Sequence, residues 1–129
     1  MERIIWRVET DPATGLPTGE PKTFRTFHGE EGAPDGSVVD LDGTLWNARW
    51  GAAALDAYAP DGTRVRSIAM PARQVSCPAF MGRAADRLVV TSAHEGMDTV
   101  TRLADPLAGQ TFLVDVLVRG RFDPPVQIA

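Results

Sequence analysis

The stretch Gly32–Gly51 reads GAPDGSVVDLDGTLWNARWG and contains two apolar runs on either side of an Asp-Gly pair. The runs are Ser37–Leu41 and Thr44–Trp50, and the pair is Asp42 and Gly43. An Asp-Gly pair between two apolar runs is a strong signal for a two-residue β-hairpin turn. The stretch therefore predicts two antiparallel strands joined by a tight turn.

The residues that follow this stretch continue the same pattern. A second Asp-Gly pair, Asp61 and Gly62, lies between further short apolar runs and predicts another hairpin, with Val65 and Ile68 among its inward-facing residues. Twelve glycines and ten prolines interrupt the chain too often for long helices. We therefore expect four consecutive antiparallel strands between Ser37 and Met70.

Strands are also predicted on both sides of this unit. The segments RIIWRVET and KTFRTFH precede it, and Pro78–Met81, Arg87–Ser92 and the segment GQTFLVDVLVRG follow it. The offset between the two later units, for example from Val38 to Ala79, is about forty residues, which is close to the ~40–45-residue period of four-stranded propeller blades.

This rhythm predicts an all-β fold, a single partial β-propeller domain of about two and a half four-stranded antiparallel blades. We expect residues 1–28 to be the last two strands of one blade, residues 35–70 a complete blade and residues 76–125 the final blade. Because a closed ring needs at least four blades, both ends would be open to a partner. A β-sandwich of about ten strands is an alternative that needs no partner.

One segment breaks the all-β pattern. Residues 93–109, AHEGMDTVTRLADPLAG, separate two predicted strands that are elsewhere joined by a few residues. Asp98 is a suitable N-cap for a short helix over 98–105, which Pro106 would end. An insertion of this length is typical of a binding loop or lid, and a solvated surface excursion is the other reading.

Composition and charge exclude several classes of protein. The chain has 129 residues, 43% of them apolar and 23% charged, which is typical of one soluble domain. A net charge of −4 provides no basic stripe for nucleic acid, and no apolar run approaches the roughly 20 residues needed to cross a membrane. The single cysteine, Cys77, forbids an internal disulfide, and the N-terminus does not resemble a secretory signal. We expect a cytoplasmic protein in which Cys77 is a small buried hydrophobe rather than a catalytic thiol.

A family resemblance adds to this reading. The segments PDGSVVDLDGTLWNARWG, YAPDGTRVRSIAMP, CPAF, LVVTSAHEGM and PLAGQTFLVDVLVRG closely resemble the C-terminal half of the gluconolactonase–regucalcin family, also called the senescence marker protein family. The likeness covers nearly the whole chain. It implies a six-bladed propeller whose central channel holds one divalent metal ion, and an enzyme that hydrolyses sugar lactones.

The resemblance also implies a ligand set. The family holds its metal with a glutamate from the first blade, an asparagine from a middle blade and the aspartate of the PDG motif, which is Asp35 here. The glutamate, the asparagine and the two family residues that hold substrate would all precede Met1. The propeller would then be completed by a missing N-terminal half or by self-association.

The chemistry of Asp35 is consistent with this implied role. A carboxylate oxygen is a hard ligand suited to Ca²⁺, Mg²⁺ or Mn²⁺ and acceptable to Zn²⁺. A divalent ion would polarise the lactone carbonyl and lower the pKa of a water molecule, so we assign Asp35 as the catalytic candidate through metal ligation rather than as a base. The local alternative is that Pro34, Asp35 and Gly36 form only a turn.

Blade topology suggests further substrate-binding candidates. Asp35, Ser76 and Cys77 should precede first strands and lie nearest the propeller axis, while Trp50 and the loop containing His94 should open on the same face. Trp50 would stack on a sugar ring, although core packing is the commoner role of tryptophan. His94 begins HEGMD, which lacks the second histidine of a zinc-protease motif, so we expect it at a substrate-contacting rim rather than on a metal.

Two functions therefore remain open. The first is a metal-dependent sugar lactone hydrolase to which this chain contributes one metal ligand. The second is a non-catalytic truncated or split propeller module that serves for binding or assembly.

Overall fold

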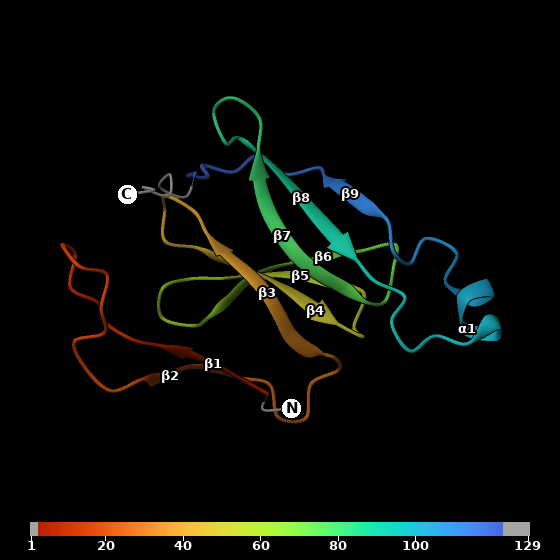
Figure 1. The fold of residues 1–129 in the computed structure, drawn as a ribbon, viewed down its shortest axis with the longest axis horizontal. Coiled ribbons are helices and arrows are strands. Elements are labelled where there is room, and N and C mark those ends of the chain that lie inside the picture. The colour runs from red at the N-terminus through yellow and green to blue at the C-terminus, as the bar shows by residue number, and fades with distance from the viewer. Residues whose placement is uncertain (1–2, 123–129) are drawn as a thin grey trace, which may run out of the picture.

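The computed structural model describes residues 3–122, which form three antiparallel β-sheets and one short helix (Figure 1). The first sheet contains β1 (Ile4–Arg7) and β2 (Lys22–Thr26), the second contains β3 (Ala33–Val39), β4 (Leu45–Trp50), β5 (Ala54–Tyr58) and β6 (Arg64–Ala69), and the third contains β7 (Val75–Met81), β8 (Arg87–Ser92) and β9 (Thr111–Val114). Helix α1 (Thr99–Ala104) lies between β8 and β9 in the chain. Strand order in each sheet follows chain order, as in propeller blades, and the expected all-β partial propeller is confirmed.

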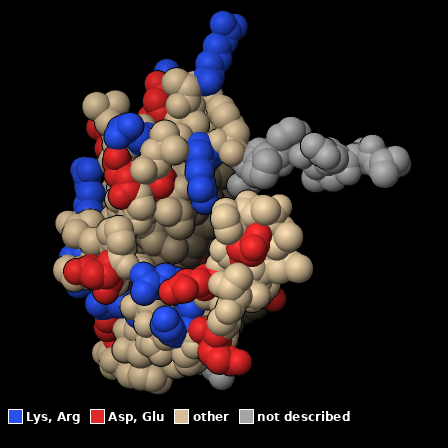
Figure 2. All heavy atoms as spheres, turned by 90° about the vertical axis from the view of Figure 1, so that its left-hand side faces the viewer, with Lys and Arg blue, Asp and Glu red and all other residues tan. Residues whose placement is uncertain are grey.

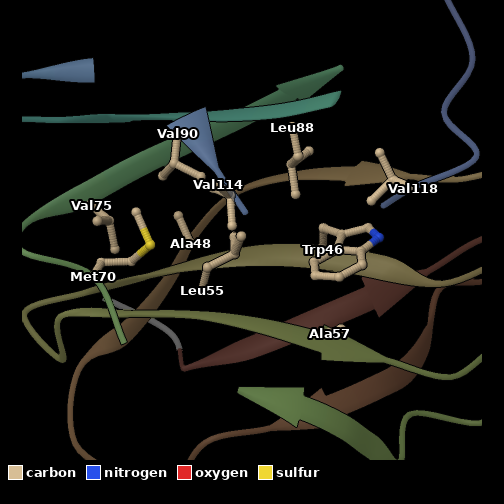
Figure 3. Packing of buried hydrophobic residues seen from close by; sticks show 10 residues of the cluster. All are labelled: Trp46, Ala48, Leu55, Ala57, Met70, Val75, Leu88, Val90, Val114 and Val118. Atoms are coloured by element: carbon tan, nitrogen blue, oxygen red, sulfur yellow. The ribbon is translucent and has the colours of Figure 1, made fainter. Parts of the chain in front are cut away.

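The apolar core lies between the second and third sheets. Figure 3 shows Trp46, Ala48 and Leu55 of the second sheet facing Val75, Leu88 and other residues of the third. Leu55, Val75 and Leu88 are fully buried. Each such side chain stabilises the fold by about 1.5–3 kcal/mol relative to an exposed position. Trp46 thus packs in the core between the second and third sheets.

The contact between the first and second sheets is aromatic and charged. The rings of Phe27 and Tyr58 meet edge to face with their centroids 5.9 Å apart, and the Arg49 guanidinium lies 4.3 Å from the centre of the Phe27 ring. Arg49 also forms a buried ion pair with Asp56 at 2.8 Å. Glu30, which follows β2, contacts the same guanidinium at 3.2 Å. This cluster ties the first sheet to the second.

The two predicted hairpins are present, but their connections are longer than two residues. Strands β3 and β4 are joined by residues 40–44, and the side chain of Asp40 forms the hydrogen bonds that hold this connection. Its carboxylate accepts hydrogen bonds from the N–H of Asp42 at 3.0 Å and of Thr44 at 2.8 Å, and from Trp46 Nε1 at 3.0 Å. Asp40 thus fixes both the turn and the core tryptophan, a role that the Asp-Gly signal did not reveal.

Strand β6 corrects a second detail of the prediction. Ile68 packs against the core as expected, whereas Val65 is 60% exposed. Side chains alternate between the two faces of a strand, so residues three apart point in opposite directions. Val65 and Ile68 therefore cannot both face inward in a regular strand.

The segment between β8 and β9 contains the predicted helix. Asp98 is its N-cap, and the Asp98 carboxylate accepts a hydrogen bond from the N–H of Thr101 at 2.8 Å. The helix buries none of its residues, and Figure 1 shows it at one end of the molecule, beyond the sheets. The segment is held instead through Asp105, whose buried carboxylate accepts a hydrogen bond from the backbone N–H of Arg73 at 2.9 Å.

The surface carries both signs of charge. Figure 2 shows acidic and basic side chains interspersed over one face of the molecule. Within residues 3–122, no helix combines the length and the hydrophobicity needed to cross a membrane.

Candidate functional site

Asp35 lies inside β3 rather than before it, at an irregularity in the strand. The pairing between β3 and β4 shifts register between Pro34 and Ser37, which is the signature of a β-bulge. The fully buried Asn47 of β4 fills this bulge. Its amide donates hydrogen bonds to the backbone oxygen of Asp35 at 2.8 Å and to the Ser37 hydroxyl at 2.9 Å. The bulge that displays the Asp35 side chain is therefore fixed by Asn47, which lies on the face of the sheet opposite the core residues Trp46 and Ala48.

The third sheet repeats this irregularity at the next pair of predicted residues. Strand β7 also shifts register against β8, between Val75 and Cys77, so Ser76 and Cys77 likewise lie within a strand rather than before it. The expectation that these residues precede their strands is wrong because a bulge lets a strand continue through residues that have a turn-like sequence.

Strands β3 and β7 lie side by side at Gly36. A Cβ atom added to Gly36 would lie 2.6 Å from the carbonyl oxygen of Ser76 and 2.8 Å from Cys77 Sγ. Such distances are too short for an alanine, so only glycine permits this approach of the two strands. The structure thus brings Gly36, the residue after Asp35, against Ser76 and Cys77.

Cys77 is exposed, and the expectation of a small buried hydrophobe is wrong. Its neighbour Pro78 is fully buried against the core, and alternation along β7 sends Cys77 and Ala79 to the opposite, open face. Ser76 is partly buried, and its hydroxyl shares a hydrogen bond with the Thr91 hydroxyl at 2.8 Å.

An open pocket of about 450 Å³ lies beside Asp35, lined by Pro34, Asp35, Trp50, Gln74 and Glu95. The structure therefore unites two of the predicted site residues, Asp35 and Trp50, in one cavity. Gln74 and Glu95 were missed, because neither stands in a recognisable motif and only the fold brings them to Asp35. The ring of His94 lies instead toward Gly109, where an added Cβ would approach Nδ1 to 2.7 Å.

Backbone hydrogen bonds hold the pocket walls together. The N–H groups of Gly51 and Ala53, which follow Trp50, donate to the Arg73 carbonyl at 2.9 and 3.2 Å. The N–H of Ala93, at the start of the loop, donates to the Gln74 carbonyl at 2.9 Å. Residues 73 and 74 therefore join the turn after Trp50 to the loop that contains Glu95.

The electrostatic setting of Asp35 favours a nearby cation. Partial desolvation raises the pKa of Asp35 above its ordinary value, and a hydrogen bond from the N–H of Gly36 only partly opposes this shift. A positive ion would offset the cost of the charged form. Within residues 3–122, however, no group of three or more His, Cys, Asp or Glu side chains is placed to hold a metal. The described residues fit one ligand of a metal site but not a complete site.

The sheets, their consecutive order and the pocket at the innermost strands define a β-propeller protein. The family model described as SMP-30/Gluconolactonase/LRE-like region matches residues 1–94. The chain belongs to this family.

Known proteins agree with this assignment. The chain is 52% identical over 124 residues to a protein of Rhizobium meliloti that is provisionally named a sugar lactone lactonase, a match that covers 96% of this chain and 42% of the relative. It is 43% identical over 100 residues to the L-arabinolactonase of Azospirillum brasilense, covering 75% of this chain and 33% of that enzyme. The chain thus spans less than half the length of these relatives.

A solved structure also supports the fold. The crystal structure of regucalcin from Agrobacterium tumefaciens, described as a calcium-binding protein, superimposes with a TM-score of 0.94 at 44% sequence identity. The match covers 98% of this chain and 43% of regucalcin. The arrangement of the three sheets is therefore that of part of a regucalcin-like propeller.

Proposed function

We propose that this chain is part of a metal-dependent hydrolase of sugar lactones. The observation that carries the proposal is the pocket in which Asp35 and Trp50 lie together, beside the close approach of β3 and β7. The names of the relatives, a sugar lactone lactonase and an L-arabinolactonase, support this reaction class. The description of the structural relative as calcium-binding supports a divalent ion.

In this proposal the chain's own residues position and orient the substrate. Asp35 would hold one divalent ion, Ca²⁺, Mg²⁺, Mn²⁺ or Zn²⁺, as a single ligand. When bound, the ion would supply Lewis-acid polarisation of the lactone carbonyl and a lowered pKa for the attacking water. Asn47 keeps the Asp35 backbone in place through its hydrogen bond, and the face of Trp50 offers an apolar surface to the ring. Ser76, Cys77 and His94 remain candidates for contacts with the substrate.

We propose that the remaining donors come from other parts of the assembled propeller. The outer face of the third sheet offers an apolar contact for further propeller sheets, because Ala79, Val89 and Leu113 form one row across β7, β8 and β9. Leu113 is 61% exposed. We propose that this row packs against sheets from the rest of a longer polypeptide or from a second copy.

A non-catalytic module for binding or assembly is the second candidate. Among residues 3–122 no group of three or more His, Cys, Asp or Glu side chains is placed to hold a metal, which favours this candidate, because one carboxylate does not hold a catalytic ion alone.

Metal content and molecular mass measured together separate the two candidates. The hydrolase predicts an assembly that binds one divalent ion per pocket and releases acid from an aldonolactone. Asp35→Asn should abolish metal binding, whereas Asp115→Asn, which changes an exposed carboxylate outside the pocket, should leave it unchanged. A monomer that binds no divalent ion and hydrolyses no lactone would leave only the non-catalytic module.

A further inference from the structure

The wall of the pocket opposite Asp35 carries two polar side chains that nothing above assigns. Glu95 is exposed at the start of the loop between β8 and β9, and its carboxylate makes no hydrogen bond or ion pair with any residue from 3 to 122. Gln74 lies beneath it and donates a hydrogen bond from Nε2 to the Glu95 backbone oxygen at 3.1 Å. Both side chains line the same cavity as Asp35 and Trp50.

The second polar atom of Gln74 lacks a partner. Its Oε1 atom is buried and accepts no hydrogen bond among the described residues. Exchanging the oxygen and nitrogen of this amide would lose the hydrogen bond to Glu95, so the network sets the orientation. This oxygen is closed to solvent, so Gln74 acts on the pocket through its Nε2 group, whose hydrogen bond holds the Glu95 backbone.

These groups select a particular ligand chemistry. The exposed Glu95 carboxylate only accepts hydrogen bonds, so it requires donors such as hydroxyl groups. Trp50 supplies an apolar face, which suits the C–H surface of a ring. The Glu95 carboxylate disfavours an anionic ligand. A neutral polyhydroxylated ring meets all three conditions, whereas the sugar acid released by lactone hydrolysis does not.

The two residues are held in place before a ligand binds. Gln74 receives the N–H of Ala93 at its backbone oxygen, and the adjacent Arg73 carbonyl receives the N–H of Gly51. The Gln74 side chain then holds the loop by its hydrogen bond to the Glu95 backbone oxygen. A site that is already ordered loses less entropy on binding, which favours affinity and discrimination.

We propose that Glu95, held in position by Gln74, binds the hydroxyl groups of a neutral sugar ring and thereby determines which lactones the pocket accepts. The proposal rests on the lactonase function above for its substrate, but the ring-binding site itself is tested separately.

The binding test uses ring polyols that cannot be hydrolysed. The probes are 1,5-anhydro-D-glucitol and 1,5-anhydroxylitol, titrated into the ¹⁵N-labelled chain in the assembly in which it is isolated. We expect saturable shifts of the Trp50 indole and Gln74 side-chain signals. Glu95→Ala and Gln74→Leu should each weaken binding about tenfold, which is the upper range for one lost hydrogen bond. Glu20→Ala, at an exposed carboxylate outside the pocket, should not.

Hydrolysis of five-carbon and six-carbon aldonolactones is measured in parallel with Ca²⁺, Mg²⁺, Mn²⁺ or Zn²⁺. A change in the kcat/KM ratio between the two lactones in Glu95→Ala supports the proposal. Unsaturable binding by the wild type, or equal affinities in wild type and variants, overturns it even if lactones are hydrolysed. Saturable binding that depends on Glu95 and Gln74 without any hydrolysis supports the ring site and refutes the proposed lactonase function.

Discussion

Replacing Gly36 by alanine tests the contact on which the site depends. The added Cβ would lie 2.6 Å from the Ser76 carbonyl oxygen, 2.8 Å from Cys77 Sγ and 2.9 Å from Cys77 Cα. Two of these three atoms belong to the backbone of β7, so a side-chain rotation cannot relieve the clash. Strands β3 and β7 must separate, and forcing an extra methyl group into a packed interface costs about 1–3 kcal/mol. We expect the upper half of that range.

Urea unfolding followed by tryptophan fluorescence measures this loss of stability. Gly19→Ala is the matched control, because its added Cβ meets no atom within 4 Å, and it should change the free energy of unfolding by less than about 0.5 kcal/mol. Combining Gly36→Ala with Cys77→Ala removes the Sγ contact but leaves the Ser76 contact, so stability should recover only in part. If Gly36→Ala is as stable as Gly19→Ala, the two innermost strands do not approach as described.

Three other predictions concern groups outside the pocket. Asp40→Asn removes one of the two carboxylate oxygens that accept hydrogen bonds from the hairpin and from Trp46. It should lower the free energy of unfolding, measured in urea titrations, by about 1–3 kcal/mol. Unchanged stability and unchanged Trp46 fluorescence would contradict that role. Burial opposes ionisation of Asp56, but its hydrogen bonds and the charge of Arg49 lower its pKa. The free energy of unfolding should therefore fall as pH drops below the ordinary pKa range of aspartate. In unfolding measured as a function of pH, Asp56→Asn should make this acid dependence weaker. Burial and the Asp56 carboxylate raise the pKa of Tyr58. The free energy of unfolding should therefore fall as pH rises above about 10, where the phenol of the unfolded chain ionises, and Tyr58→Phe should remove that loss. An equal alkaline loss in the wild type and the variant would refute the assignment.

Much of the fold was predictable because it depends on short-range signals. Asp-Gly pairs between apolar runs identified two of the three hairpins of the second sheet, and Asp98 identified the start of α1. The errors arise where the relevant partner is distant in sequence. The exposure of Cys77 depends on which face of β7 meets the core, and the strand-internal position of Asp35 depends on a bulge filled by Asn47.

The residues of the candidate site differ in the same way: some could be predicted from short-range signals and others depend on distant partners. Asp35 and Trp50 lie 15 residues apart on a strand pair, so their proximity follows from one predicted hairpin. Gln74 lies just before β7 and Glu95 follows β8, so their place in the pocket requires the packing of the third sheet on the second. A polar residue in a loop carries no local signal of such a role.

The packing suggests that the pocket's two sides tolerate change differently. The Asp35 side chain is exposed, but its backbone is fixed by the hydrogen bond from the buried Asn47 and by the contact of its neighbour Gly36 with β7. Glu95 belongs to a loop whose helix buries no residue, so a change there costs little stability. The group proposed to hold the metal is thus fixed by the same packing that joins two sheets. The group proposed to choose among sugar rings can vary without unfolding them, which would let one scaffold accept different lactones.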